Sequence, residues 1–219
     1  MWIDLATPWQ ACLEEAWAAY CAGSKPIGAV VADGEGRILS RGRNHIKDED
    51  AEKGEVCRNQ LAHAELNALL KVDPISKTIL HKSILYSTLQ PCPLCFGAFY
   101  MSGVRELCYA ARDAYGGSDD LLGKTPYLSV KPIRVHPPQD AELEQMVIAM
   151  LTADTLAESS LRLDVVVEAE RRIQPEAVEF GEFLFRDKWL PQMRKDQFTA
   201  KAMYDNLRYL YITIHPASQ

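Results

Sequence analysis

The chain has 219 residues, 47% of them hydrophobic and 25% charged, and its formal net charge is −6. This length and balance are typical of a soluble globular protein with one large domain, or one domain with an appendage. The acidic charge argues against a polyanion-binding module, six scattered cysteines are too few for a disulfide scaffold, and neither a signal peptide nor an apolar run that spans a bilayer is recognisable. We therefore expect a cytoplasmic protein.

The N-terminal part predicts a helix and then a β-hairpin. Thr7 and Pro8 are typical of an N-cap and a first helical residue, and Gly23 is typical of a helix end. Residues 27–33 (IGAVVAD) and 37–42 (RILSRG) flank a glycine turn and predict two paired strands.

The middle of the chain alternates between helical and strand patterns. After a polar loop over residues 44–60, helices are expected over residues 62–72 and 93–103, and strands over residues 82–89, 104–111 and 131–137. Such alternation implies right-handed parallel crossovers. With the preceding hairpin, it predicts an α/β fold in which a mixed sheet lies between helices.

The C-terminal part predicts a strong amphipathic helix over residues 140–158, with Asp140 near its N-terminus, and a strand-like run over residues 161–173 (LRLDVVVEAERRI). The rest is rich in aromatic residues, which most often pack on a host domain or a partner subunit. A nucleic-acid stacking platform would need a basic surround that is absent. We interpret residues 1–150 as one domain, and residues 151–219 as a mostly helical extension that caps a pocket or forms an oligomer interface.

Cys92 and Cys95 form a Cys-x-x-Cys pair, a pattern shared by redox couples, structural zinc sites and catalytic metal sites. Upstream, His63 and Glu65 stand two residues apart. One imidazole and two thiolates are good zinc ligands, and three protein ligands are typical of catalytic zinc because structural sites usually close with four. A redox couple would leave His63 and Glu65 unexplained. The set favours one catalytic zinc ion per chain.

The spacing of these residues restricts their geometry. Residues i and i+2 lie roughly 200° apart on an ideal helix, so His63 and Glu65 converge only at a helix start. Cys92 and Cys95 share one face of a helix's first turn, where the N-terminus stabilises thiolates. We therefore predict two helix N-termini that face one zinc ion.

This arrangement predicts hydrolysis. Zinc lowers the pKa of its bound water from 15.7 toward about 7. Glu65 then takes a proton from the water and returns it to a ring nitrogen and a leaving amine, which is general acid–base catalysis. The attacked carbon bears an exocyclic amine, and ammonia leaves.

With its His-Ala-Glu and Pro-Cys-x-x-Cys segments, together with PIGAVVAD, GRN and YAARDAYGGS, the sequence resembles the zinc-dependent cytidine deaminase-like superfamily over about residues 1–125. The pattern is most similar to tRNA adenosine deaminases and bacterial guanine or related purine deaminases. The resemblance implies a three-layer α/β/α fold, a five-stranded mixed sheet and a homodimer. It also implies that Asn44 contacts the substrate, that the backbone N–H groups of Ala64 and Cys92 lie near the zinc-bound water or substrate, and that Asp113 rims the pocket.

Some of these roles have plain structural alternatives. Asn44 is also compatible with a turn after a strand, and Asp113 with the following glycines is typical of a surface loop. The absence of an Asn-x-Glu element argues against a free cytidine deaminase. Gln90 stands where the superfamily often has glutamate, so its role is open.

The substrate is expected to be a small amino-heterocycle, with a purine-type base or nucleoside such as guanine or adenosine favoured. The loop over residues 47–55 (KDEDAEKGE) contains five acids and two lysines, and at a substrate entrance it would repel phosphates. One alternative is a tRNA-specific adenosine deaminase. Another is a zinc-stabilised binding scaffold whose chemistry has lapsed, although the presence of Glu65 argues against it.

Overall fold

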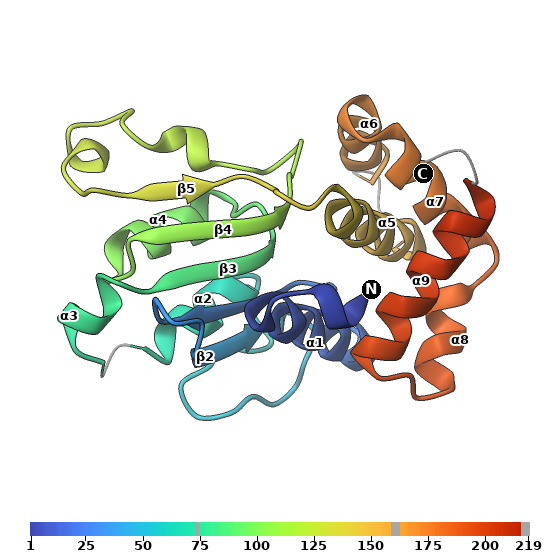
Figure 1. The fold of residues 1–219 in the computed structure, drawn as a ribbon, viewed down its shortest axis with the longest axis horizontal. Helices are drawn as coiled ribbons and strands as arrows, with labels where there is room; N and C mark the ends of the chain where they lie inside the picture. Colours follow the sequence, from blue (N-terminus) through green and yellow to red (C-terminus); the bar gives the residue numbers. More distant parts are fainter. Residues whose placement is uncertain (73–74, 159–162, 216–219) are drawn as a thin grey trace.

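A five-stranded mixed sheet lies at the centre of the computed structural model, which describes residues 1–72, 75–158 and 163–215 (Figure 1). Its strands are β1 (Gly28–Ala32), β2 (Ile38–Arg43), β3 (Ile84–Leu89), β4 (Glu106–Ala111) and β5 (Arg134–His136), in the order β2-β1-β3-β4-β5. β1 is antiparallel to β2 and to β3, whereas β3, β4 and β5 run parallel. The predicted α/β fold with a five-stranded mixed sheet is confirmed.

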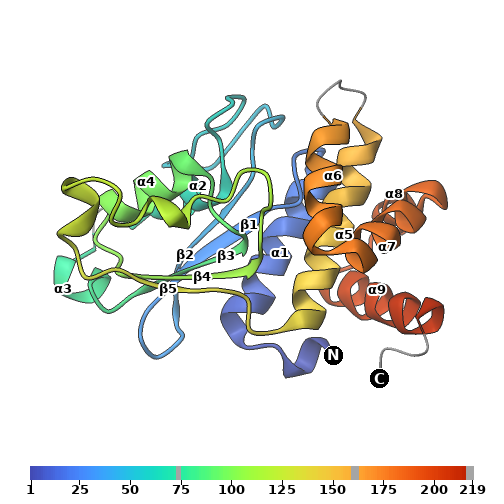
Figure 2. The same ribbon diagram turned by 90° about the horizontal axis from the view of Figure 1, so that it is seen from above.

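Helices cover both faces of this sheet, as Figure 2 shows. The helices α1 (Thr7–Ala22) and α5 (Ala141–Ala157) pack on one face, and α2 (Ala64–Leu70) packs with α4 (Pro93–Met101) on the other. The short helix α3 (Lys77–Leu80) precedes β3, and short 3-10 helices span Trp2–Asp4, Asp119–Leu121 and Tyr127–Ser129. β1 is buried along its whole length because it lies between two helical layers, which explains its uninterrupted apolar sequence.

Two glycines let helices approach the sheet closely. A Cβ atom on Gly28 would lie 2.1 Å from the carbonyl oxygen of Cys12 in α1. A Cβ atom on Gly42 would lie 2.3 Å from the backbone nitrogen of Ala68 in α2. Any side chain at either position would therefore push its helix away from the sheet.

The predicted first helix and hairpin are confirmed, with one shift at the helix start. Ala6, rather than Thr7, is the N-cap of α1, and it offers no side-chain hydrogen bond. Pro8 lies in the first turn, and Gly23 ends the helix with a left-handed φ of 92°. The predicted central helices and the short strand before α5 are also confirmed.

The C-terminal part forms a further helical layer beyond α1 and α5 (Figure 2). Its helices are α6 (Leu163–Ile173), α7 (Pro175–Arg186), α8 (Trp189–Lys195) and α9 (Ala200–Ile214). The mostly helical extension is thus confirmed, but the strand-like interpretation of residues 161–173 is wrong. Residues 163–173 are helical because Val167 packs into the helical core while Glu168 pairs across one turn with Arg171, and residues 161–162 lie outside the described part of the chain.

The helix α5 differs from the amphipathic helix that its sequence predicts. Asp140 caps it, accepting a hydrogen bond from the backbone of Leu143 at 3.0 Å, as expected near the N-terminus. However, buried residues occur around its circumference because β4 packs on one side and α7 on another. Residue 150 lies inside α5, so the boundary between a domain of residues 1–150 and an extension stays a prediction. Among the described helices, none is long and apolar enough to cross a membrane.

Candidate metal centre and adjoining pocket

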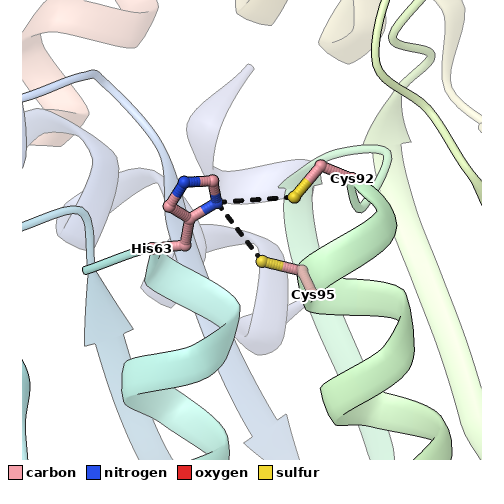
Figure 3. Close-up of side chains that lie close together, drawn as sticks. All are labelled: His63, Cys92 and Cys95. Atoms are coloured by element: carbon pink, nitrogen blue, oxygen red, sulfur yellow. Dashed lines mark hydrogen bonds between the residues drawn. The ribbon is translucent and has the colours of Figure 1, made fainter. Parts of the chain in front are cut away.

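Two helix N-termini bring the predicted metal ligands together. His63 is the N-cap of α2, Cys92 is the N-cap of α4, and Cys95 lies in the first turn of α4. Pro93 stands at the start of α4, where its fixed φ favours helix initiation and its missing N–H is not needed. Figure 3 shows the imidazole of His63 directed toward both sulfur atoms.

The distances in this cluster fit a tetrahedral zinc site. The Nδ1 atom of His63 lies 3.6 Å from Sγ of Cys92 and 3.4 Å from Sγ of Cys95 (Figure 3). Zinc bonds of about 2.0–2.3 Å at tetrahedral angles place nitrogen and sulfur ligands roughly 3.5 Å apart. The three side chains are therefore positioned to bind one metal ion, and their donor atoms are those that zinc prefers.

The ligand cluster also favours a thiolate. The hydrogen bond from the Cys95 thiol, followed by the hydrogen bond to His63, lowers the pKa of Cys92 to about 4. The hydrogen bond between Cys95 and Cys92 raises the pKa of Cys95. The hydrogen bond between His63 and Cys92 raises the pKa of His63. A divalent cation would bind once both thiols are deprotonated, because metal binding requires deprotonated ligands.

Glu65 lies beside the metal ligands. Its side chain is 4% exposed, and burial is the first cause that raises its pKa. Its Oε1 atom accepts a hydrogen bond from Oγ of Ser87 at 3.1 Å, and its Oε2 atom accepts one from the Cys95 thiol at 3.3 Å. The predicted convergence of Glu65 with the ligand set at a helix start is therefore present. Ser87 was missed by the sequence interpretation, although a serine within an apolar strand was a signal.

A cavity of about 220 Å³ adjoins the metal centre. His63, Asn44 and Asp113 line one side of it. Apolar residues of the C-terminal helices line the other side, including Ile148 and Leu151 of α5 and Val166 and Val167 of α6. The cavity therefore has a polar end at the metal ligands and a largely apolar roof.

Asn44 serves a turn and also faces this cavity. It is 2% exposed, and its Oδ1 atom accepts a hydrogen bond from the backbone of Ile46 at 3.1 Å. Its side-chain amide donates to no atom among the described residues and is free to bind a ligand. Asn44 therefore both stabilises the turn and lines the cavity, so the two interpretations do not exclude each other.

Asp113 and Gln90 build the loop beside the cavity. Asp113 accepts hydrogen bonds from the backbone of Tyr115 at 3.0 Å and of Gly116 at 2.6 Å, and burial raises its pKa. Gln90 accepts a hydrogen bond from the backbone of Asp113 at 3.1 Å and donates one to Asp119 at 2.6 Å. The hydrogen bonds of Gln90 thus stabilise this loop rather than orient a metal ligand. Contact of Asp113 with a substrate stays a prediction.

The first residue of α2 lies directly after the ligand His63. Ala64 is fully buried, and its backbone N–H has no intrahelical partner because it belongs to the first turn. Its contact with a substrate also stays a prediction.

The acidic loop does not rim this cavity as expected. Asp50, Glu52 and Glu55 line a different cavity, where Glu55 pairs with Lys71 at 2.6 Å. The reason is that the loop folds toward the end of α2, where Glu55 meets Lys71, whereas Asn44 and Ile46, which precede the loop, line the cavity beside His63.

Acids of the C-terminal helices stand near that cavity instead. Lys25 lines it and pairs with Asp154 at 3.0 Å and with Glu158 at 3.0 Å. Lys47 also pairs with Glu158, at 2.5 Å. Lys25, which lines the cavity, is thus matched by two carboxylates, so it offers no excess of positive charge there.

Known proteins share the metal-binding part of this fold. Residues 5–111 match the family described as cytidine and deoxycytidylate deaminase zinc-binding region. The chain is 34% identical over 114 residues to the tRNA-specific adenosine deaminase of Bacillus subtilis, covering 50% of this chain and 63% of that protein. It is 32% identical over 108 residues to that of Rickettsia bellii, covering 48% of this chain and 69% of that protein. The structure of a guanine deaminase from Nitrosomonas europaea superposes with a TM-score of 0.52 and 26% identity, over 68% of this chain and 85% of that one.

These similarities are incomplete in two respects. The chain spans between 16% and 63% of the length of the first curated relatives that it matches. The family match ends at Ala111, so β5 and the helices α5 to α9 lie outside it. The metal ligands therefore fall within the shared region, whereas the apolar roof of the cavity is formed by residues beyond it.

Proposed function

The chain belongs to the zinc-dependent cytidine deaminase-like family, and from this membership we propose that it is a hydrolytic deaminase that releases ammonia from a small amino-substituted heterocycle. One observation carries the proposal. His63, Cys92 and Cys95 converge with the buried carboxyl of Glu65, and His63 also lines a small cavity. This combination supports a metal ion and a proton carrier beside a space for a ring.

The residues of the site have distinct roles in this reaction. His63, Cys92 and Cys95 would hold zinc, which when bound lowers the pKa of a water molecule toward about 7. The buried carboxylate of Glu65 would carry the two protons of that water in turn, the first to the ring nitrogen and the second to the leaving amine. The carbon–nitrogen bond to the amine breaks, a carbon–oxygen bond replaces it, and ammonia leaves.

The helix start and the turn beside it would orient the substrate. The free amide of Asn44 faces the cavity and can donate a hydrogen bond to the ring or its substituent. The backbone N–H of Ala64, at the start of α2, is a second donor near the metal ligands. Asp113 supplies an acceptor on the same side.

A free purine-type base or nucleoside is the favoured substrate. The cavity of about 220 Å³ is smaller than the roughly 300–1,000 Å³ of sites that hold drug-sized ligands, so it suits a single small heterocycle. Lys25 in its lining is paired with Asp154 and Glu158, which leaves little charge for a phosphate backbone. A structure related in fold, with a TM-score of 0.53, is a complex with 2,6-diaminopurine.

An ammonia-release panel tests this proposal. Zinc-loaded protein would be offered guanine, adenine, adenosine, cytosine, a pterin and a triazine, together with a tRNA anticodon stem-loop. We expect release from a purine and none from the stem-loop, with Glu65→Ala abolishing release. Release from no heterocycle, or release that Glu65→Ala leaves unchanged, would contradict the proposal.

A tRNA-specific adenosine deaminase is the second candidate. Two relatives that are 34% and 32% identical to the chain carry that name, which is the observation in its favour. Conversion of adenosine to inosine in the stem-loop, without turnover of any free base, would select it. A lapsed binding scaffold would bind zinc and release no ammonia from any member of the panel.

The C-terminal extension is proposed to cap the site, since α5 and α6 line the cavity. By resemblance to the family we also propose a homodimer. Light scattering coupled to gel filtration measures the mass of the assembly, and a monomer at micromolar concentration would contradict this.

A further inference from the structure

Glu170, in the second half of α6, has a buried carboxyl group. One of its oxygens accepts a hydrogen bond, and the other has no partner among the described residues. Its side chain is 8% exposed. Its Oε1 atom accepts a hydrogen bond from the backbone of Ala114 at 2.7 Å. Its Oε2 atom is buried and has no hydrogen-bond partner among the described residues. A buried acceptor without a partner costs free energy, so this atom is suited to a partner from outside the chain.

The place of Glu170 indicates what that partner is. Glu170 lines the same cavity as His63, together with the apolar side chains of Leu151, Val166 and Val167. Lys25 is the one cation among the lining residues, and it already pairs with acids of α5 and its C-terminal end. The carboxyl of Glu170 is therefore a polar group in the lining of a cavity that includes His63, and its Oε2 atom lies just beneath the surface of that lining.

We infer that Glu170 determines substrate specificity by accepting, through Oε2, a hydrogen bond from a second N–H donor on the amino-bearing ring of a free heterocyclic base. The inference rests on the proposed function, because it assigns the ligand of that same site. The bond from Ala114 restricts the orientation of the carboxyl at the lining of the cavity, which lowers the entropic cost when a ring binds. A site with such an acceptor rejects analogues that lack the donor, because the acceptor is then left unpaired.

Burial is the largest cause that raises the pKa of Glu170 to about 7, and the nearby charges of Asp113 and Glu144 raise it further. Binding measurements at pH 8 therefore keep the carboxyl largely ionised and able to accept.

The test compares three free bases that differ in one donor at a time. The compound 2,6-diaminopurine carries two exocyclic amines, adenine lacks the amine at position 2, and 2-aminopurine lacks the amine at position 6. Dissociation constants would be measured calorimetrically at pH 8 with the full-length, zinc-loaded Glu65→Ala variant, which holds the bases without turnover. We expect 2,6-diaminopurine to bind at least 10-fold tighter than one of the two mono-amino bases, as a hydrogen bond to a charged group predicts.

Glu170→Gln in the same background should remove this advantage. Glutamine keeps an oxygen for the backbone of Ala114 but presents an amide donor in place of Oε2, so the ratio of dissociation constants should fall at least 10-fold. The matched control is Glu168→Gln, an exposed residue of the same helix that pairs with Arg171 and Arg172 and does not line the cavity. It should leave the ratio unchanged.

The ratio separates recognition from a structural role, since loss of stability weakens all three bases alike. An unchanged ratio in Glu170→Gln, an equal change in Glu168→Gln, or no binding of 2,6-diaminopurine would overturn the inference. Ammonia release by the wild-type protein is measured separately. Release with an unchanged ratio refutes the role of Glu170 alone, whereas a changed ratio without release refutes the proposed deamination alone.

Discussion

The metal end and the roof of the cavity are built from the chain in different ways. The metal ligands and Glu65 lie within residues 63–95 and are placed by the first residues of two helices. The roof comes from α5 and α6, which lie outside the region that matches the deaminase family. Local helix geometry thus determines which chemical groups meet at the site, whereas packing between distant segments determines the shape of the cavity.

The largest effect should come from removing a ligand at the metal end. We expect Cys92→Ala to lower bound zinc from one per chain to a small fraction, with loss of ammonia release, because two remaining ligands do not hold a catalytic metal. Mass spectrometry of the metal content measures this. Cys108→Ala, a half-buried cysteine of β4 outside the ligand cluster, is the control and should retain zinc. Full zinc content in Cys92→Ala would contradict the assignment of the ligands.

The next largest effect should come from Glu65, beside the metal ligands, where a substitution separates metal binding from proton transfer. Glu65→Gln should retain zinc and lower kcat by about 10²- to 10⁴-fold, the range of general acid–base catalysis. Steady-state kinetics with the best substrate of the panel, together with metal analysis, measure both quantities. Glu35→Gln, at an exposed turn, should change neither. A kcat within threefold of wild type would refute the role of Glu65.

A substitution that creates a cavity in the C-terminal helical layer should lower the stability of the fold and leave the metal ligands unaffected. Phe180 in α7 is 1% exposed and packs against Phe183 and Tyr211, so Phe180→Ala should lower the free energy of unfolding by about 3–5 kcal/mol. Urea unfolding measures this loss, and zinc content should stay near one per chain. Tyr209→Ala, 70% exposed on α9, should cost less than about 0.5 kcal/mol. Loss of zinc without loss of stability would show that the two regions are not separable in this way.

The smallest effect concerns the pH dependence of the roof. Folding raises the pKa of Glu170 from about 4.5 to about 7, chiefly through burial, so the folded state binds its proton more tightly. The contribution of Glu170 to stability is therefore fully present below about pH 4.5 and is lost as the pH rises toward 7.

Wild type should accordingly lose unfolding free energy relative to Glu170→Gln between pH 5 and pH 8, by about 2–3 kcal/mol, since the pKa rises from 4.5 to about 7 and each pKa unit corresponds to about 1.4 kcal/mol. Urea unfolding of both proteins at the two pH values measures this, and protonation of the metal ligands cancels in the difference. The same comparison with Glu168→Gln should show no pH dependence. If wild type instead gained unfolding free energy relative to Glu170→Gln as the pH rises, Glu170 would be favoured in its ionised form.

Sequence reasoning reached the metal end because helix starts have strong local rules. Pro93 and the i, i+3 spacing of Cys92 and Cys95 predict one face of a first turn, and the i, i+2 spacing of His63 and Glu65 excludes a position inside a helix. Neither constraint depends on the rest of the chain. The structure accordingly has His63 and Cys92 as helix N-caps.

The same reasoning failed where neighbours decide the outcome. Three consecutive valines in residues 161–173 suggested a strand, yet residues 163–173 form α6 because one face of that helix packs on α5. The acids of residues 47–55 suggested a charged entrance, yet Glu55 is buried in an ion pair with Lys71. Local composition cannot show which surface such a segment covers.

By itself, therefore, the sequence determined which three side chains converge as metal ligands, which carboxyl lies beside them and the α/β class, because each depends on residue type and short spacing along one helix or strand. Only the tertiary structure decided which segments close the cavity. Ser87 meets Glu65 across 22 positions of the chain, and Glu170 meets Ala114 across 56. Contacts over such separations follow from the packing of whole layers, which no short stretch of sequence specifies.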